Sequence, residues 1–158
     1  MKGLAVSAPA LRAMRRYANA AYPEECCGFL LSPPEDASVL EIRPIVGSEP
    51  APNRSTGERQ RRFVILPQEL REAEARAAER ELVVSGFYHS HPDHPARPSV
   101  FDQEHAWPWY AYLILATDRA ARASEVGAFE LDPERREFQT ISLTVTPPTA
   151  EALGVGLP

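Results

Sequence analysis

The sequence predicts an α/β (α+β) fold in which a mixed β-sheet is flanked by helices. Apolar residues recur at helical spacing in some segments and form short strand-like runs in others, and the two kinds interleave along the chain. Some strand-like runs are joined by turn-rich stretches, which indicates hairpins within the sheet. At 158 residues, 44% hydrophobic and 25% charged, the chain has the composition of one globular domain. We expect that domain to cover residues 1–146, and residues 147–158 to form a flexible C-terminal tail.

The first expected elements are one helix and two strands. Ser7 can cap a helix over about 8–21 with Pro9 in its opening turn, and Pro23 ends it because a residue before proline avoids helical geometry. One face of this helix is apolar: Leu11, Met14, Ala18 and Ala21. Strands are expected at 28–31 and 39–46, and the turn-rich stretch 32–36 between them predicts a hairpin.

The middle of the chain predicts a loop followed by a helix. Periodicity is absent from 47 to 62, where proline, asparagine, serine and glycine accumulate, so we expect a long surface loop that ends in a short strand at 63–65. Pro67 then opens a second helix, whose narrow apolar stripe should lie on the sheet: Leu70, Ala73 and Ala77. Glu72 and Arg76, four positions apart, belong to its solvent side.

The C-terminal half predicts the core of the sheet. We expect an apolar strand at 82–88, a short helix at 99–106 and a central strand at 110–116 that is apolar on both faces. A closing hairpin follows, formed by the run 126–131, the turn at Asp132 and Pro133, and the alternating Ile141, Leu143 and Val145.

Composition excludes several classes of function. No apolar run approaches the length of a membrane span, and the first seven residues are too short for a secretory leader, so we expect a cytoplasmic protein without a membrane partner. The only cysteines, Cys26 and Cys27, are adjacent and cannot join distant segments. A net charge of −5 and the lack of a basic stripe argue against nucleic acid as a partner.

The most informative motif is His89-x-His91-x7-Ser99-x-x-Asp102. In an extended backbone His89 and His91 point the same way, so both rings can reach one ion. Two imidazoles and the Asp102 carboxylate are three ligands that suit Zn²⁺, and they leave the fourth position open for water, as catalytic zinc requires. Ser99 and Asp102 also fit a helix N-cap, which does not exclude metal ligation. We leave His94 and His105 out of the ligand set.

A zinc-activated water also needs a carboxylate that takes up its proton. Glu24 and Glu25 precede the strand that starts at Gly28, and from there either could face a metal at the sheet edge. An acidic pair at a helix end is also commonly solvated, so the residue pattern alone leaves this role open.

With these residues in place, the sequence resembles the JAMM (MPN-plus) metallopeptidase family. The family pattern is a distant glutamate followed by His-x-His-x7-Ser-x-x-Asp, and residues 23–28, Pro-Glu-Glu-Cys-Cys-Gly, resemble its Pro-x-Glu-x-Cys-Gly stretch. Further similarity to the small prokaryotic branch lies in 61–63, 86–92 and 106–108, and the likeness extends from about residue 8 to 143. The resemblance implies a curved mixed sheet of the cytidine-deaminase-like JAMM/MPN architecture.

The resemblance also implies a role for each motif residue. His89, His91 and Asp102 would hold one Zn²⁺ per chain, Glu25 would be general base and then acid, and Ser99 would hydrogen-bond the developing oxyanion. Small prokaryotic relatives process the Gly-Gly tail of ubiquitin-like sulfur-carrier proteins, so the expected activity is a zinc metallopeptidase or isopeptidase acting on such a carrier or its conjugate.

Several alternatives remain open. The chain could be a non-catalytic MPN scaffold, although the intact ligand set counts against it, or a zinc hydrolase of a small amide. The basic loop 54–62 could dock an acidic face of the carrier or be solvated. Cys26 and Cys27 could be buried thiols or a redox switch beside Glu25. A homodimer is among the possible assemblies.

Overall fold

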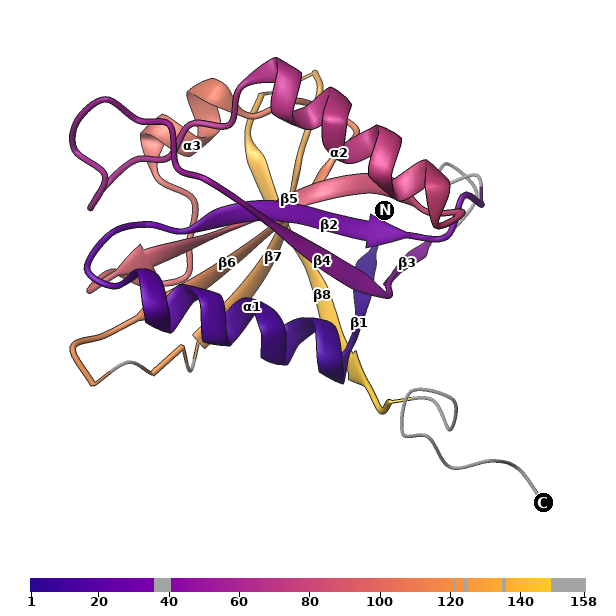
Figure 1. Cartoon of the computed structure of the whole chain (residues 1–158), viewed down its shortest axis with the longest axis horizontal. Helices are drawn as coiled ribbons and strands as arrows, with labels where there is room; N and C mark the ends of the chain where they lie inside the picture. The colour runs from indigo at the N-terminus through magenta and orange to yellow at the C-terminus, as the bar shows by residue number, and fades with distance from the viewer. Residues whose placement is uncertain (36–40, 121, 124, 135, 149–158) are drawn as a thin grey trace.

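The described residues of the computed structural model, 1–35, 41–120, 122–123, 125–134 and 136–148, form a curved, nearly closed sheet with three helices (Figure 1). The sheet has eight strands in the order β3-β1-β8-β7-β6-β5-β2-β4. Its strands are β1 (Gly3–Ser7), β2 (Cys27–Ser32), β3 (Ile42–Ile45), β4 (Gly47–Ala51), β5 (Val83–Pro92), β6 (Ala111–Thr117), β7 (Glu125–Leu131) and β8 (Phe138–Thr146). Parallel and antiparallel pairs both occur, so the predicted mixed α+β sheet is confirmed.

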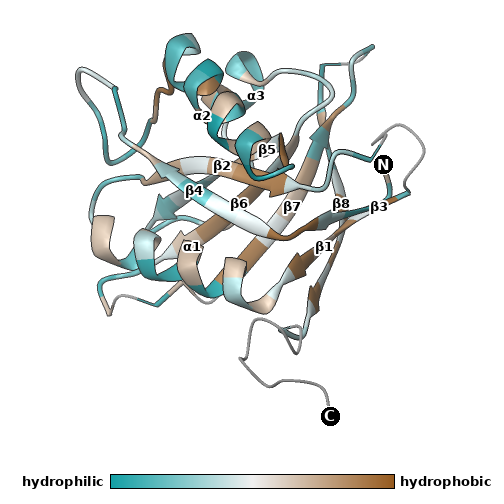
Figure 2. Cartoon of the chain, turned by 45° about the vertical axis from the view of Figure 1, so that its right-hand side comes forward, coloured by the Kyte–Doolittle hydropathy of each residue, from teal (hydrophilic) through white to brown (hydrophobic). Residues whose placement is uncertain are grey.

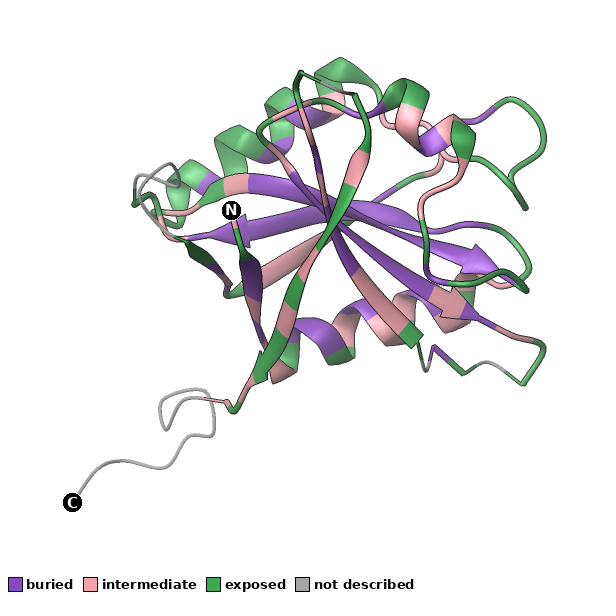
Figure 3. Cartoon of the chain, turned by 180° about the vertical axis from the view of Figure 1, so that it is seen from behind, coloured by how far each residue is buried: buried purple, intermediate pink, exposed green. Residues whose placement is uncertain are grey.

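The helices cover both faces of the sheet. Helix α1 (Ala8–Ala21) lies on one face, and α2 (Pro67–Glu79) and α3 (Val100–His105) lie toward the other (Figure 1). Successive strand residues point to opposite faces, so the central strands feed two apolar cores. In β6, Leu113 and Leu115 join the core that contains α1, whereas Tyr112 and Ile114 join the core that contains α2. Figures 2 and 3 show hydrophobic and buried residues concentrated on these central strands.

The two long helices begin where the sequence predicts, and α1 also ends at the predicted residue. Ser7 caps α1 by accepting the backbone N–H of Ala10 through its hydroxyl oxygen, at 3.3 Å. Pro67 opens α2, and the carboxylate of Glu69 accepts the Leu66 N–H at 3.0 Å. The predicted stripe on α2 is buried against the sheet: Leu70, Ala73 and Ala77. Both helices are thus confirmed.

The N-terminal third differs from the prediction. The expected hairpin between the strands at 28–31 and 39–46 is wrong, because β3 pairs in parallel with β1 instead of with β2. Strand β2 pairs with β4, which lies in the expected loop 47–62. Residues 36–40, where the second predicted strand was to begin, lie outside the described residues. Strand β1 was not predicted, although Leu4 and Val6 alternate with more exposed neighbours.

Two further expectations concern short segments. The segment 63–65 is not a strand. Among the described residues, its only backbone bond to a neighbouring segment is the one that Val64 O accepts from Arg54 N, at 2.9 Å. The closing hairpin is confirmed by the antiparallel pairing of β7 and β8.

Of the expected tail, only Pro147 and Pro148 are described, and residues 149–158 lie outside the described part. No helix in the described ranges is long and apolar enough to span a membrane.

The pairing of β5 places the two histidines of the motif on an interior strand of the sheet. Strand β5 runs parallel to β6 on one side and antiparallel to β2 on the other. Gly86 permits the close approach of β6, because a Cβ at this position would lie 2.1 Å from the Ala111 carbonyl oxygen. In the antiparallel pair of β5 with β2, Cys27 lies opposite His89. The residues just before β2 therefore lie beside the histidine end of β5.

Candidate metal centre and active site

The two histidines of the motif lie side by side on β5. His89 and His91 are 1% and 7% exposed, and their Nε2 atoms are 3.0 Å apart. Because the residues are two apart on an extended strand, both rings leave the same face of the sheet, as expected. The Nδ1 of His91 lies 3.0 Å from the carbonyl oxygen of Pro95. A proton on that nitrogen leaves the Nε2 lone pair free to bind a cation.

Asp102 completes the group from α3. Its Oδ2 lies 3.1 Å from His91 Nε2 and 3.3 Å from His89 Nε2. Burial acts to raise the pKa of this carboxyl, but the two histidines and the Ser99 N–H outweigh it and hold the pKa well below its usual value. The carboxylate therefore stays charged inside the protein, beside two imidazoles.

Ser99 is the N-cap of α3. Its N–H donates to Asp102 Oδ2 at 2.8 Å, and its hydroxyl oxygen accepts the Asp102 N–H at 3.1 Å. This reciprocal pair is a capping box, so the cap and the placement of Asp102 beside the histidines occur together. The Ser99 hydroxyl proton is not used by the cap.

The three donor atoms fit a tetrahedral metal. Zinc binds histidine nitrogen at about 2.0–2.1 Å and carboxylate oxygen at about 2.0–2.2 Å, so neighbouring tetrahedral ligands lie about 3.3 Å apart. The observed separations of 3.0, 3.1 and 3.3 Å are close to this value. Two neutral imidazoles and one carboxylate are also a ligand set that suits Zn²⁺. The residues present therefore fit the ion that the sequence predicts.

Glu25 is the second carboxylate beside the histidines. It is 3% exposed, and one of its carboxylate oxygens lies within 4.8 Å of a ring nitrogen of each histidine. Burial raises its pKa to about 8, an effect that His91 opposes and the charge of Asp102 reinforces. Its Oε1 has no hydrogen-bond partner among the described residues. When this carboxyl is ionised, its unbonded oxygen is free to accept a proton from a bound molecule.

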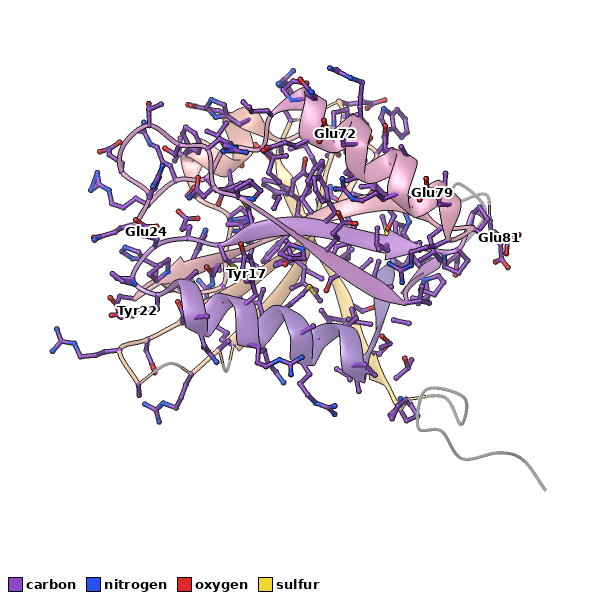
Figure 4. All side chains as sticks on the ribbon, in the orientation of Figure 1. Tyr17, Tyr22, Glu24, Glu72, Glu79 and Glu81 are labelled. Carbon is purple, nitrogen blue, oxygen red and sulfur yellow. The ribbon has the colours of Figure 1, made fainter. Side chains whose placement is uncertain are left out.

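The neighbouring Glu24 does not reach the site. It is exposed, and Figure 4 shows it at the edge of the molecule. Of the acidic pair that the residue pattern left open, only Glu25 faces the histidines. The other histidines of the chain, His94 and His105, are both exposed, although His105 borders the cavity described next.

A cavity of about 290 Å³ opens beside this group. Its walls come from the segment 63–65, from α3 and from β5 and β6, and His89 and Asp102 form one end. The lining is mainly apolar and aromatic: Phe63, Ile65, Phe87, Phe101, Trp107 and Tyr112. The Phe63 ring stacks on His89 with ring centroids 4.5 Å apart. The cavity is therefore an apolar groove that leads to the histidines.

Sequence reasoning missed two parts of this site. The aromatic lining comes from segments that are far apart in sequence, so no single motif shows it. Asn53 lies in the expected loop 47–62, and no motif shows that its side chain bonds to the backbone of Glu25. The adjacent cysteines are buried, and burial raises the pKa of the Cys26 thiol to about 11 and raises that of Cys27 as well.

Comparison with known proteins agrees with this geometry. The family described as prokaryotic homologs of the JAB domain matches residues 7–130. A desampylase from Haloferax volcanii is 33% identical over 107 residues, which are 65% of this chain and 70% of that protein. A protein from Salinibacter ruber has a solution structure that is 36% identical, with a TM-score of 0.67 and 94% of each chain covered.

Two further solved structures share the fold. A protein from Desulfitobacterium hafniense has a TM-score of 0.76 at 23% identity, covering 94% of this chain and 96% of that one. A JAB1/MPN domain protein from Archaeoglobus fulgidus has a TM-score of 0.55 at 16% identity, covering 90% and 98%. The chain belongs to the prokaryotic homologs of the JAB domain, a small prokaryotic branch of the JAMM/MPN family.

Proposed function

We propose that this chain is a zinc metallopeptidase of the isopeptidase type, which hydrolyses an amide bond at the C-terminal Gly-Gly tail of a ubiquitin-like protein. The observation that carries the proposal is the convergence of His89, His91 and Asp102 beside a buried Glu25, whose Oε1 has no hydrogen-bond partner in the described part of the chain. The similarity to a desampylase supports a ubiquitin-like modifier as the class of substrate. We assign the catalytic domain to residues 1–146.

In this proposal His89, His91 and Asp102 hold the zinc ion. When bound, zinc lowers the pKa of water to near 7 and polarises the carbonyl that is attacked. The His91–Pro95 contact orients one ring, and stacking on Phe63 orients the other. These contacts hold the ligand atoms in place before the ion binds, which lowers the cost of ordering them.

Glu25 moves the proton. Its unpartnered oxygen takes a proton from the attacking water and then gives it to the leaving amine. Ser99 would donate its hydroxyl proton to the oxygen that becomes negative in the transition state, since its cap bond uses only an oxygen lone pair and leaves that proton free. Both residues then act on the same carbonyl from fixed elements of the fold.

The groove suits an extended tail. Val64 turns its backbone N–H and C=O inward, to Asn53 Oδ1 at 3.2 Å and to Arg54 N at 2.9 Å. No described residue bonds to the backbone of Phe63 or Ile65. A peptide added as a strand along this edge would run toward the histidines.

The test combines metal analysis with activity. Purified protein should contain one zinc per chain and should release a reporter joined by an amide bond to a ubiquitin-like protein that ends in Gly-Gly. Glu25→Gln should keep the zinc and lose hydrolysis, whereas His89→Ala should lose both. Glu24→Gln is the matched control and should behave as wild type, because Glu24 is exposed. Full activity in zinc-loaded Glu25→Gln would contradict the role of Glu25.

The same assay separates the alternatives. A scaffold would bind the carrier without releasing the reporter. A hydrolase of small amides would cleave a short Gly-Gly amide as well as the full carrier, and the cavity of about 290 Å³ is near the lower end of small-molecule pockets. A tail-specific isopeptidase should instead show a much lower KM for the carrier than for the short amide.

We also propose that the basic loop 54–62 docks an acidic face of the carrier. Several of its charges are already paired, Arg54 with Glu69, and Arg61 and Arg62 with Glu58. Among the described residues, no acidic side chain pairs with Arg59. Reversing Arg59 and Arg61 to glutamate should weaken processing of an acidic carrier and spare a short peptide. Equal loss on both substrates would argue that the loop does not dock the carrier.

A further inference from the structure

The side-chain amide of Asn53 uses all of its hydrogen-bonding capacity on backbone groups. Its Nδ2 donates to the carbonyl oxygen of Glu25 at 3.1 Å and to that of Arg62 at 2.9 Å. Its Oδ1 accepts the N–H of Ser55 at 3.0 Å and that of Val64 at 3.2 Å. A carboxamide has two N–H donors and two acceptor lone pairs, so all four are satisfied.

These four bonds join two parts of the site that are distant in sequence. Glu25 lies on the turn before β2, whereas Arg62 and Val64 flank Phe63 on the wall of the groove. The N–H of Glu25 also donates to the Arg59 carbonyl at 2.7 Å, so both backbone groups of Glu25 bond to the segment 53–59. The position of Glu25 and the position of the groove wall are therefore coupled through this segment.

The histidine strand fixes the other side of Glu25. The N–H of Cys26 donates to the Ser90 hydroxyl oxygen at 2.8 Å, and the Ser90 N–H donates to the Cys26 carbonyl at 3.1 Å. Ser90 lies between His89 and His91. One side of the Glu25 backbone is thus tied to the histidines and the other to Asn53, so a shift on the Asn53 side alone would rotate the carboxyl relative to the rings.

Only asparagine supplies this pattern at this distance. Aspartate has the same shape but no N–H to offer the carbonyls of Glu25 and Arg62, and its charge would face two carbonyl oxygens. Glutamine is one methylene longer. Alanine offers neither donors nor acceptors.

We propose that Asn53 is a positioning residue, which sets the backbone of Glu25 relative to the wall of the substrate groove. The inference rests on the proposed function, because it assigns the effect of Asn53 to the proton transfer by Glu25. It adds to that function a residue outside the motif and a reason why Glu25 and the groove keep their relative positions. Asn53 does not touch the reacting atoms.

The test uses three variants of the full chain. Asn53→Asp keeps the two acceptor contacts and loses the two donor contacts, and Asn53→Ala loses all four. Asn19→Asp is the matched control, because Asn19 is the only other asparagine, is half-buried on α1, and its Oδ1 has no described partner. The measurements are zinc content, kcat and KM on the carrier fusion and on a short Gly-Gly amide, and amide hydrogen exchange of the metal-free protein.

The expected results differ between the two variants. Asn53→Asp should lower kcat roughly tenfold to a hundredfold on both substrates, because a small misplacement of a catalytic group has effects of this size. Its zinc content and the protection of the Ser55 and Val64 amides should stay as in wild type. Asn53→Ala should lose that protection too and should also raise KM for the carrier, since the groove wall is released. Asn19→Asp should match wild type in all measurements.

Several results would overturn the inference. These are a kcat of Asn53→Asp equal to that of Asn19→Asp, a change confined to KM, and a loss of zinc that accounts for the loss of rate. A lower melting temperature with unchanged kcat well below melting, or unfolding of both Asn53 variants, would show a structural role only. An active wild type with any of these results leaves the proposed function intact, whereas an inactive wild type overturns both.

Discussion

Replacing Glu25 by glutamine should stabilise the metal-free protein while it removes activity. Burial raises the pKa of Glu25 from 4.5 to about 8 in the folded state. Because the folded-state pKa is the higher one, the contribution of this group to stability is full below pH 4.5 and is lost as the pH rises through 8. Between pH 4.5 and pH 7 the free energy of unfolding falls by about 3 kcal/mol, since one pKa unit corresponds to about 1.4 kcal/mol.

Glutamine has nearly the same shape as protonated glutamate and does not titrate. The free energy of unfolding of Glu25→Gln should therefore exceed that of wild type by about 3 kcal/mol at pH 7 and by less than about 1 kcal/mol at pH 5. Urea denaturation in the presence of a chelator measures both values. Glu24→Gln, with an exposed side chain, should show no gain at either pH.

Addition of zinc offers an independent check of the same reasoning. A nearby dication favours the carboxylate, so the stability gain of Glu25→Gln should shrink when zinc is bound. A variant that is no more stable than wild type at pH 7, or a gain that does not change with pH, would refute the argument that burial of Glu25 costs stability. The proposed catalytic base would then be in a more polar environment than the structure indicates.

Three further predictions test other features of the fold. Gly86→Ala should lower the free energy of unfolding by at least about 1–3 kcal/mol in chemical denaturation, because the new Cβ would lie 2.1 Å from a carbonyl oxygen of β6. Gly57→Ala is the control: a Cβ there would meet nothing within 4 Å, so stability should change by less than about 0.5 kcal/mol. The thiols of Cys26 and Cys27 should resist a thiol reagent near neutral pH in the folded protein and react fully in denaturant, because both are buried with raised pKa values, and rapid reaction when folded would favour a redox role. Trp109→Gly should raise the melting temperature, with a gain of roughly 1 kcal/mol, because Trp109 is 78% exposed at a φ of 77° that glycine adopts without strain; a lower melting temperature would mean that its ring contributes packing.

The parts of the fold that follow local patterns were predictable from the sequence. Helix α1 has a cap, a proline at each end and an apolar face, and each of these signals depends only on neighbouring residues. The spacing of His89 and His91 predicts convergence because strand geometry alone turns both rings to one side. The resemblance to the JAMM family singled out Glu25, and the structure places this residue and not Glu24 beside the histidines.

The parts that depend on distant partners were not predictable in this way. Apolar and polar residues are mixed throughout residues 42–51, without a visible break. The chain nevertheless changes its pairing strand after Val46, from β1 to β2. Nothing local distinguishes this change from a continuous strand. Likewise, Asn53 resembles any loop asparagine until the fold brings Glu25 and Val64 to its two ends.

The parallel pairing of β1 with β8 separates the order of synthesis from the order of folding. Gly3 faces Ser142 across this pair, so β1 gains this neighbour only after synthesis has reached β8. Until then, β1 has one edge whose backbone N–H and C=O groups are unpaired. Such an edge recruits chaperones or pairs with another copy of the chain. Pairing β1 with β8 in this way makes the arrival of β8, rather than any single hydrophobic contact, the event that joins β1 and β3 to the other strands of the sheet.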